Sequence, residues 1–283
     1  TWKPDLTISG STQYLGVKPY GMERFYQLFM DRQLVALTVF SDLVQEAVNR
    51  VRIDTLKVST TDNDRHLADG GVSAFSYGEA IGLYLACATD RCADYWSSLA
   101  IWAGDFVAHT FGRQALPMTW DYAECNPFSD STGCWQGAIN WVLRAVEQLP
   151  ASSNSLALQA DAARQNLTAG KIVSTDPPYF DNVPYADLSD FFYIWMRRSL
   201  GQIFPTLFAT LAVPKAEELV AFAYRHVSKE EAEMFFLDGM TQAMCQLAKH
   251  SHPAFPVTIY YAFKQAESDT TEGTASTGWE TFL

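Results

Sequence analysis

Four consecutive residues, Asp176, Pro177, Pro178 and Tyr179, carry the groups in this chain that are best suited to chemistry. They follow an apolar run that begins at Ile172 and that the prolines must end, because proline cannot continue a central strand. The sequence therefore predicts a buried strand that delivers this tetrad to the rim of a sheet, where ligands bind in α/β proteins. There the tetrad would offer a carboxylate, backbone carbonyls next to prolines that lack N–H groups, and an aromatic ring. This set suits an exocyclic amine on a planar base.

A structural interpretation of the same residues is open as well, in which the prolines merely end a strand and Tyr179 packs in the core. A given four-residue string with two prolines should arise in a chain of this length on the order of once in a thousand sequences. We therefore favour the chemical interpretation.

Composition limits the classes of partner. The chain has 283 residues, of which 48% are hydrophobic, enough for one large domain or two modest ones. Its net charge of −12 argues against a general phosphate-binding surface, because non-specific affinity for DNA comes from Lys and Arg, so any contact with nucleic acid must be local. The sequence has no run of about twenty apolar residues and no leader, which predicts a soluble, cytoplasmic protein without membrane contact. A chain that starts at Thr1 without Met is expected to be a piece of a longer protein.

The cysteines predict neither a metal centre nor a disulfide framework. They are five in number, Cys87, Cys92, Cys125, Cys134 and Cys245, and no two of them form a C-x-x-C pair. We expect buried, reduced thiols and no bound metal.

Hydrophobic periodicity predicts a helix-heavy chain. Helices are expected over residues 31–51, 76–99, 134–149, 187–200 and 228–247. Capping boxes are expected to begin two of them, Ser76 with Glu79 and Ser228 with Glu231. Residues 57–71 are predicted to form a loop, and residues 110–128 have the mixed composition of a pocket wall.

A second strand is predicted over residues 256–263. A helix precedes it and follows the tetrad, which fits a βαβ crossover and hence a parallel sheet.

Asp-Pro-Pro-Tyr at the end of a strand resembles the catalytic motif of S-adenosylmethionine-dependent amino-methyltransferases, which modify adenine N6 or cytosine N4. More specifically, residues 175–182 and 185–193 are similar to the large adenine-specific DNA methylases of bacteria and archaea. The resemblance covers nearly the whole chain, because further segments are similar in the same order: residues 32–34, 90–95, 111–115, 126–128 and 260–264.

The resemblance implies S-adenosylmethionine as cofactor, DNA as partner, and the tetrad Asp176, Pro177, Pro178 and Tyr179 as catalytic residues. In such enzymes the target base is flipped out of the duplex, and the aromatic residue, here Tyr179, stacks on it. The Asp176 carboxylate and the Pro177 carbonyl would accept the two hydrogens of the amine and aim the nitrogen at the methyl group. No metal is required.

The residues after the tetrad are expected to bind the substrate: Phe180, Asp181, Asn182 and Tyr185. The implied setting is a restriction-modification or phage-defence system, whose other subunits would be further partners.

The implied fold is α/β, a partial Rossmann-like methyltransferase sheet with a large helical insertion, helix-rich overall. Residues 1–75 would form an N-terminal helical segment packed on the catalytic domain, and residues 76–150 the helical insertion. Residues 151–283 would form the methyltransferase-like catalytic segment.

One departure from the family pattern concerns the cofactor. Those enzymes bind it through a strand followed by a glycine-rich turn upstream of the tetrad, and no such sequence lies between Thr1 and Gly170. The cofactor-binding residues are therefore unknown. Either the chain is an internal piece of a longer methylase, which we favour, or it is a non-catalytic nucleic-acid-binding or scaffolding relative that has lost cofactor binding. An amino-methyltransferase acting on RNA or on cytosine N4 is a third hypothesis.

Overall fold

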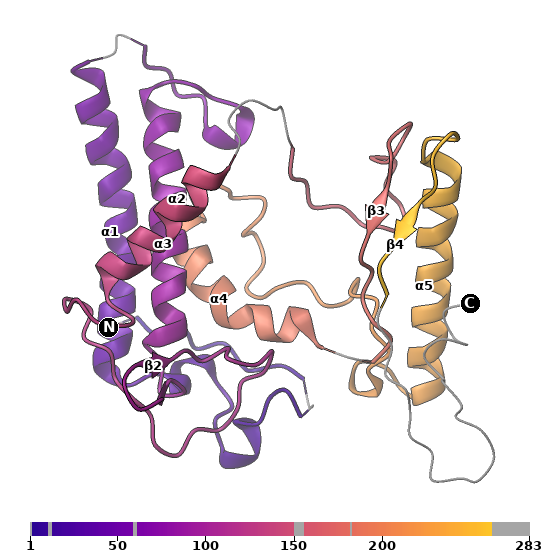
Figure 1. The fold of residues 1–283 in the computed structure, drawn as a ribbon, viewed down its shortest axis with the longest axis horizontal. Coiled ribbons are helices and arrows are strands. Elements are labelled where there is room, and N and C mark those ends of the chain that lie inside the picture. Colours follow the sequence, from indigo (N-terminus) through magenta and orange to yellow (C-terminus); the bar gives the residue numbers. More distant parts are fainter. Residues whose placement is uncertain (1, 11–12, 59–60, 150–155, 182, 262–283) are drawn as a thin grey trace. The chain divides into compact units, whose positions relative to one another are not determined.

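A computed structural model describes residues 2–10, 13–58, 61–149, 156–181 and 183–261 of the protein (Figure 1). The chain divides into two compact units. Unit 1 contains residues 1–153 and 185–213, and unit 2 contains residues 154–184 and 214–283. Helix predominates over strand, and the two sheets in the described part have two strands each, so the helix-rich α/β composition agrees in coarse terms with the sequence.

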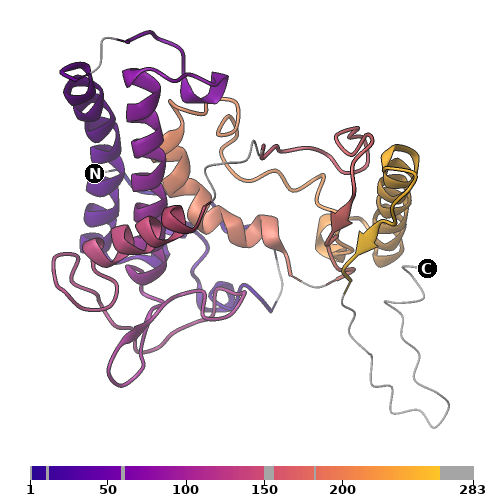
Figure 2. The ribbon, with the colours of Figure 1, turned by 45° about the horizontal axis from the view of Figure 1, so that its top comes forward.

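Unit 1 is built on helices α1 (Asp31–Leu56), α2 (Ala74–Tyr95), α3 (Trp135–Gln148) and α4 (Tyr185–Leu200). Helix α2 packs against each of the other three, and α1 also packs against α4 (Figures 1 and 2). The sequence predicts that Leu34, Leu37, Val44, Val48 and Val51 share the apolar face of the first helix. The first four are buried, and Val51 is partly buried.

Glycines allow α1 and α2 to approach closely. A Cβ atom on Gly78 would lie 2.7 Å from the carbonyl oxygen of Val48, and one on Gly82 would lie 2.5 Å from a methyl carbon of the same valine. Since side-chain atoms cannot occupy such positions, only glycine permits this contact between the helices.

The start of α2 differs from the prediction. Ser73, not Ser76, is the N-cap residue, and the Ser73 N–H donates to the Ser76 hydroxyl at 2.8 Å. Glu79 is buried and faces the preceding loop, where its carboxylate accepts the Leu67 N–H at 2.6 Å and contacts His66 Nδ1 at 2.7 Å. The predicted Ser76–Glu79 capping box is therefore wrong, because the long-range partners of Glu79 compete with the local one.

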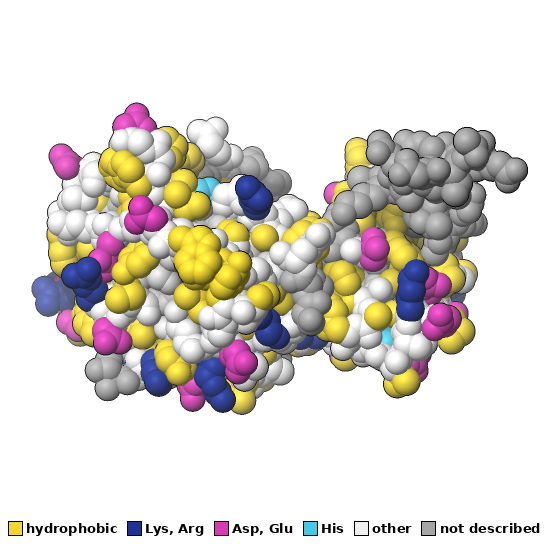
Figure 3. Space-filling view, turned by 90° about the horizontal axis from the view of Figure 1, so that it is seen from below, with side chains coloured by type: hydrophobic (Ala, Val, Ile, Leu, Met, Phe, Trp, Pro, Cys, Tyr) yellow, Lys and Arg dark blue, Asp and Glu magenta, His cyan; other side chains and the backbone are white. Residues whose placement is uncertain are grey.

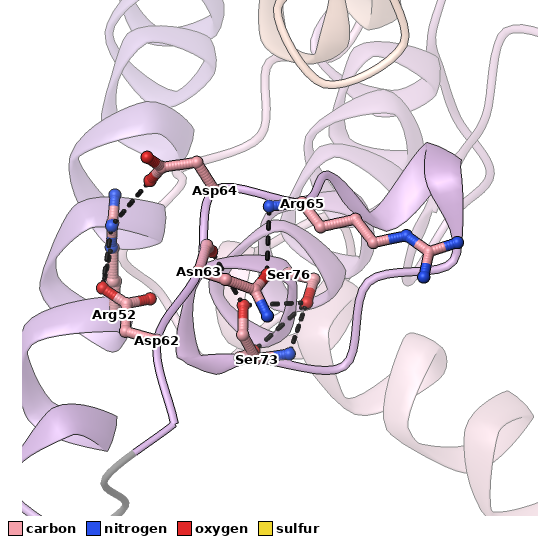
Figure 4. Close-up of polar contacts among 7 residues, drawn as sticks. All are labelled: Arg52, Asp62, Asn63, Asp64, Arg65, Ser73 and Ser76. Atoms are coloured by element: carbon pink, nitrogen blue, oxygen red, sulfur yellow. Dashed lines mark hydrogen bonds and ion pairs between the residues drawn. The ribbon is translucent and has the colours of Figure 1, made fainter.

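The loop before α2 is held by ion pairs and hydrogen bonds (Figure 4). Arg52 of α1 contacts Asp62 at 2.8 Å and Asp64 at 3.2 Å. The Ser73 hydroxyl donates to the carbonyl of Asn63 at 3.1 Å. These contacts fix residues 61–64 across the ends of α1 and α2.

The remaining elements of unit 1 are short. Strands β1 (Ile101–Trp102) and β2 (Val107–Ala108) form an antiparallel hairpin. Short 3₁₀ helices cover Lys18–Tyr20, Phe25–Leu28 and Leu67–Asp69. Among the helices that the structure describes, none has the length and apolar character that a membrane crossing demands.

Unit 2 contains strand β3 (Ser174–Thr175), the 3₁₀ helix Ala223–Arg225, helix α5 (Lys229–His250) and strand β4 (Thr258–Ile259). The two strands are parallel, with Ser174 opposite Thr258 and Thr175 opposite Ile259, so the predicted parallel pair is confirmed. The predicted cap of α5 is confirmed too, because the Ser228 hydroxyl accepts the Glu231 N–H at 3.2 Å. Residues 262–263 of the predicted second strand lie outside the described residues.

The prediction of a buried strand before the tetrad is only half right. Val173 is buried, but Ile172 is 65% exposed and Ser174 is exposed. The side chains of β3 alternate between the two faces of the sheet, and within the described residues β4 is its only partner strand. One face of β3 is therefore open to solvent.

Candidate active site

The tetrad begins where the β3–β4 ladder ends. The Tyr260 N–H donates to the carbonyl of Thr175 at 2.8 Å, and Asp176 follows directly. Pro177 and Pro178 have no N–H to extend the ladder. Because the strands are parallel, the residues that follow β4, Tyr260 and Tyr261, emerge at the same edge as the tetrad.

Two hydrogen-bond acceptors of the tetrad are unused within the described part of the chain. Asp176 is exposed, and its carboxylate accepts no hydrogen bond and forms no ion pair there. The carbonyl oxygen of Pro177 accepts no backbone N–H among the same residues. The exposed carboxylate of Asp176 is thus available to a hydrogen-bond donor, whereas the neighbouring Pro177, whose carbonyl has no backbone partner, is itself buried.

The aromatic residue of the tetrad is held by a second tyrosine. The rings of Tyr179 and Tyr261 meet edge to face, with centroids 5.4 Å apart and planes at 80°. The Tyr261 hydroxyl also accepts the backbone N–H of Phe180 at 3.3 Å. Tyr261 therefore fixes both the ring and the backbone at the end of the tetrad.

Tyr261 remains a neutral phenol at physiological pH. Partial burial raises its pKa, and the nearby Asp181 carboxylate acts in the same direction because it opposes a second negative charge. The hydrogen bond from the Phe180 N–H lowers the pKa by a smaller amount.

Phe180 anchors the exit of the tetrad in the core of unit 2. Its ring meets the fully buried Phe236 of α5 edge to face at 5.2 Å. Its carbonyl accepts the Ala221 N–H at 2.7 Å. Both contacts belong to the apolar cluster that α5 forms with the chain before it. The structure gives Phe180 a packing role, and the substrate-binding role remains a prediction.

The other predicted substrate residues are not all in one unit. Asp181 is exposed next to Tyr261 in unit 2. Tyr185 belongs to unit 1 and is 48% exposed. It is the first residue of α4, which starts two residues before the predicted helix. Asn182 lies outside the described residues.

Sequence reasoning missed Tyr261 as a site residue. It treated Tyr261 as part of a strand, without asking where that strand ends. The available signal was the parallel pairing itself, because the carboxyl ends of adjacent parallel strands lie at the same edge of a sheet.

The described residues form no recognisable binding site for a metal or a cofactor. No group of three or more His, Cys, Asp or Glu side chains in the described part could hold a metal ion. The cysteines are free, and burial raises the pKa of Cys92 and raises that of Cys125 to about 11, so both remain thiols. The glycine pair Gly70 and Gly71 does not form a phosphate-binding loop. A Cβ on Gly71 would lie 2.3 Å from the Arg65 carbonyl oxygen, so the space beside this glycine is filled by the chain itself.

The suspected pocket wall borders a cavity in unit 1. Glu124, Cys125, Asn126 and Pro127 line a space of about 320 Å³ together with α1 and Trp96. This volume is at the lower end of the range for small-molecule sites. The composition of residues 110–128 thus predicted a real surface feature, although not its ligand.

Comparisons of this chain with models of protein families, with curated proteins and with solved structures gave no match. The function must therefore be argued from the site.

Proposed function

We propose that this protein is the tetrad-bearing part of an S-adenosylmethionine-dependent DNA methyltransferase that acts on adenine N6. The observation that carries the proposal is the pair of unused acceptors, the Asp176 carboxylate and the Pro177 carbonyl, beside the ring of Tyr179 at the end of a parallel strand. The resemblance of residues 175–182 and 185–193 to adenine-specific methylases supports the choice of adenine.

The proposed chemistry is one of positioning. A flipped base would lie against the ring of Tyr179, whose edge-to-face contact with Tyr261 limits its rotation. Asp176 and Pro177 would each accept one hydrogen of the exocyclic amine, which directs the nitrogen lone pair away from them. The negative charge of Asp176 also stabilises positive charge that develops on the amine during methylation.

S-adenosylmethionine would supply the methyl group. The residues assembled around the tetrad include no glycine-rich turn, so the described part of unit 2 does not identify the groups that would hold this cofactor. Within the described residues β3 and β4 pair only with each other, and the proposal places the further strands of a larger sheet at their outer edges.

Two measurements test the proposal. Calorimetric titration of the protein with S-adenosylmethionine measures cofactor binding. Transfer of a labelled methyl group to adenine-containing DNA measures activity, with nucleoside analysis of the product. We expect Asp176→Ala to lower turnover by about 100-fold or more while the affinity for the cofactor stays the same. Asp238→Ala, on the exposed side of α5, is the matched control and should leave both unchanged.

The outcomes separate the hypotheses. Methylcytosine, or transfer to RNA alone, would reassign the substrate. Cofactor binding without transfer would favour a non-catalytic relative. No binding at all would mean either a piece of a longer methylase that lacks its cofactor-binding segment or a non-catalytic relative, and cofactor binding by the longer protein would separate the two. Transfer that survives Asp176→Ala would remove the carboxylate from the mechanism.

A further inference from the structure

A cavity of about 260 Å³ lies in unit 1 between α2, α3 and the loop before α3. Arg91 and Tyr95 of α2 line one side, Trp141 of α3 lines another, and the hydroxyl residues Ser131 and Thr132 lie in the loop. The volume falls below the range of about 300–1,000 Å³ that is usual for drug-sized ligands. The cavity is large enough for one small polar group of a ligand, and the rest of the ligand would lie outside it.

Arg91 lies over two aromatic rings, and no described carboxylate forms an ion pair with it, although the exposed Asp130 lines the same cavity. Its guanidinium carbon lies 4.6 Å from the centre of the Trp141 ring and 5.6 Å from that of Tyr95. Within the described part of the chain Arg91 makes no hydrogen bond and no ion pair, whereas Arg52 and Arg198 pair with carboxylates. A cation–π contact uses the charge of the guanidinium and none of its N–H groups as hydrogen-bond donors, so these groups remain available. Arg91 is therefore held in place for an anion.

A second arginine extends the stack. Arg144, one turn after Trp141 on α3, lies 5.7 Å from the centre of the Trp141 ring and is exposed. Trp141 is itself 55% exposed. Tyr95, Arg91, Trp141 and Arg144 thus alternate aromatic and cationic groups, which is the combination that binds single-stranded nucleic acids through phosphates and stacked bases.

The loop that faces Arg91 is rigidly attached. The indole N–H of Trp96 donates to the Gly133 carbonyl at 2.7 Å. Gly133 has a φ of +80°, and a Cβ there would lie 2.5 Å from the sulfur of Cys125, so glycine is required. The N-terminal amide of Gly137 in α3 is occupied by Cys134. Arg91, rather than the helix end, is therefore the anion-binding group.

We infer that unit 1 binds a strand of nucleic acid here, with a phosphate at the edge of Arg91 and a base stacked beside Trp141. The net charge of −12 argues against a general phosphate-binding surface, so the contact is local. The face of unit 1 drawn in Figure 3 mixes hydrophobic, basic and acidic side chains. This site is independent of the tetrad and needs no methyl transfer. Free mononucleotides carry the same chemistry and are the alternative source of the ligand.

The test is fluorescence anisotropy of a labelled single strand of more than about 16 nucleotides, titrated with the full chain between about 50 and 200 mM salt. We expect Arg91→Gln to weaken binding and to reduce the slope of log affinity against log salt by about 0.7, the value for one phosphate on a single strand. Arg91→Lys, which keeps the charge, should restore most of that slope. Trp141→Ala should weaken binding by about 5- to 150-fold.

Two further variants control the experiment. Arg50→Gln removes an exposed arginine of α1 that is paired with Asp54, and it should leave affinity and slope unchanged. Asp130→Asn removes an exposed carboxylate at the cavity and should tighten binding. Circular dichroism of each variant verifies the fold.

Three results would overturn the inference. The first is wild-type protein that binds no strand at about 50 mM salt. The second is an Arg91→Gln variant that folds and keeps both affinity and slope. The third is that deoxyadenosine monophosphate displaces the strand completely, with a dissociation constant equal to that of the strand for one binding site. That result would reassign the cavity to free nucleotides. Methyl transfer plays no part in any of these measurements, so they fail or succeed separately from the proposed function.

Discussion

Replacing Phe236 with alanine should release the end of the tetrad. Phe236 is fully buried on α5 and contacts the ring of Phe180 at 5.2 Å, within a cluster that also contains Ala221 and Met240. Truncation of a buried phenylalanine costs about 3–5 kcal/mol, because transfer energy is lost and a cavity remains. The ring of Phe180 would border the new cavity, so we expect the lost stability to appear as easier opening of the backbone at Phe180.

Hydrogen exchange measures this effect locally. The Ala221 N–H donates to the Phe180 carbonyl at 2.7 Å, so its protection reports on opening of this contact. At about 1.4 kcal/mol for each factor of ten, the expected loss predicts protection lower by about 100- to 4,000-fold, up to complete loss. Tryptophan fluorescence is less suitable, because all the tryptophans of the chain except Trp279 belong to unit 1.

Met234→Ala is the matched control. Met234 lies two residues away on α5 and is 59% exposed, so its truncation should change the protection of Ala221 little. Equal protection of Ala221 in wild type and in Phe236→Ala would refute the argument that this cluster anchors the tetrad. Equal losses in both variants would indicate general destabilisation of α5 instead.

Two predictions concern the helices of unit 1, and tryptophan fluorescence during urea unfolding measures both. Gly82→Ala should destabilise unit 1 by about 1–2 kcal/mol despite its better helix propensity, because the new methyl group meets Val48. Adding Val48→Ala should make the combined cost smaller than the sum, and strict additivity would exclude this clash. Burial and the charge of Asp94 raise the pKa of Asp90 well above its usual value. Unfolding therefore releases this proton above about pH 4, so stability falls as pH rises above that value, and Asp90→Asn should reduce that fall.

The sequence by itself determined the local elements. The capping pair Ser228 and Glu231 started α5 as predicted, and the apolar period of residues 31–51 defined the buried face of α1. Such signals depend on contacts within three or four residues, which any reader of the sequence can evaluate. The sequence also predicted the parallel pairing of β3 with β4, because two strands of one sheet that are joined through a helix usually run parallel.

Only the tertiary structure decided which distant residues meet. Glu79 was predicted to close a local capping box, but His66 and Leu67 from the preceding loop take its carboxylate. Ile172 was predicted to be buried, yet one face of its strand has no cover in the described residues. Glu79 has long-range partners that replace the local one. Ile172 lacks the long-range cover, within the described residues, that its apolar side chain predicts.

The same distinction applies to the candidate site. The sequence identified Asp176, Pro177 and Tyr179 because their types and order carry chemistry within four residues. It could not identify Tyr261, some eighty residues later, as the ring against Tyr179, nor Arg91 as a cation stacked on Trp141. Those pairs exist because strand register and helix packing bring them within about 6 Å, and the chain between them does not encode that distance in any local pattern.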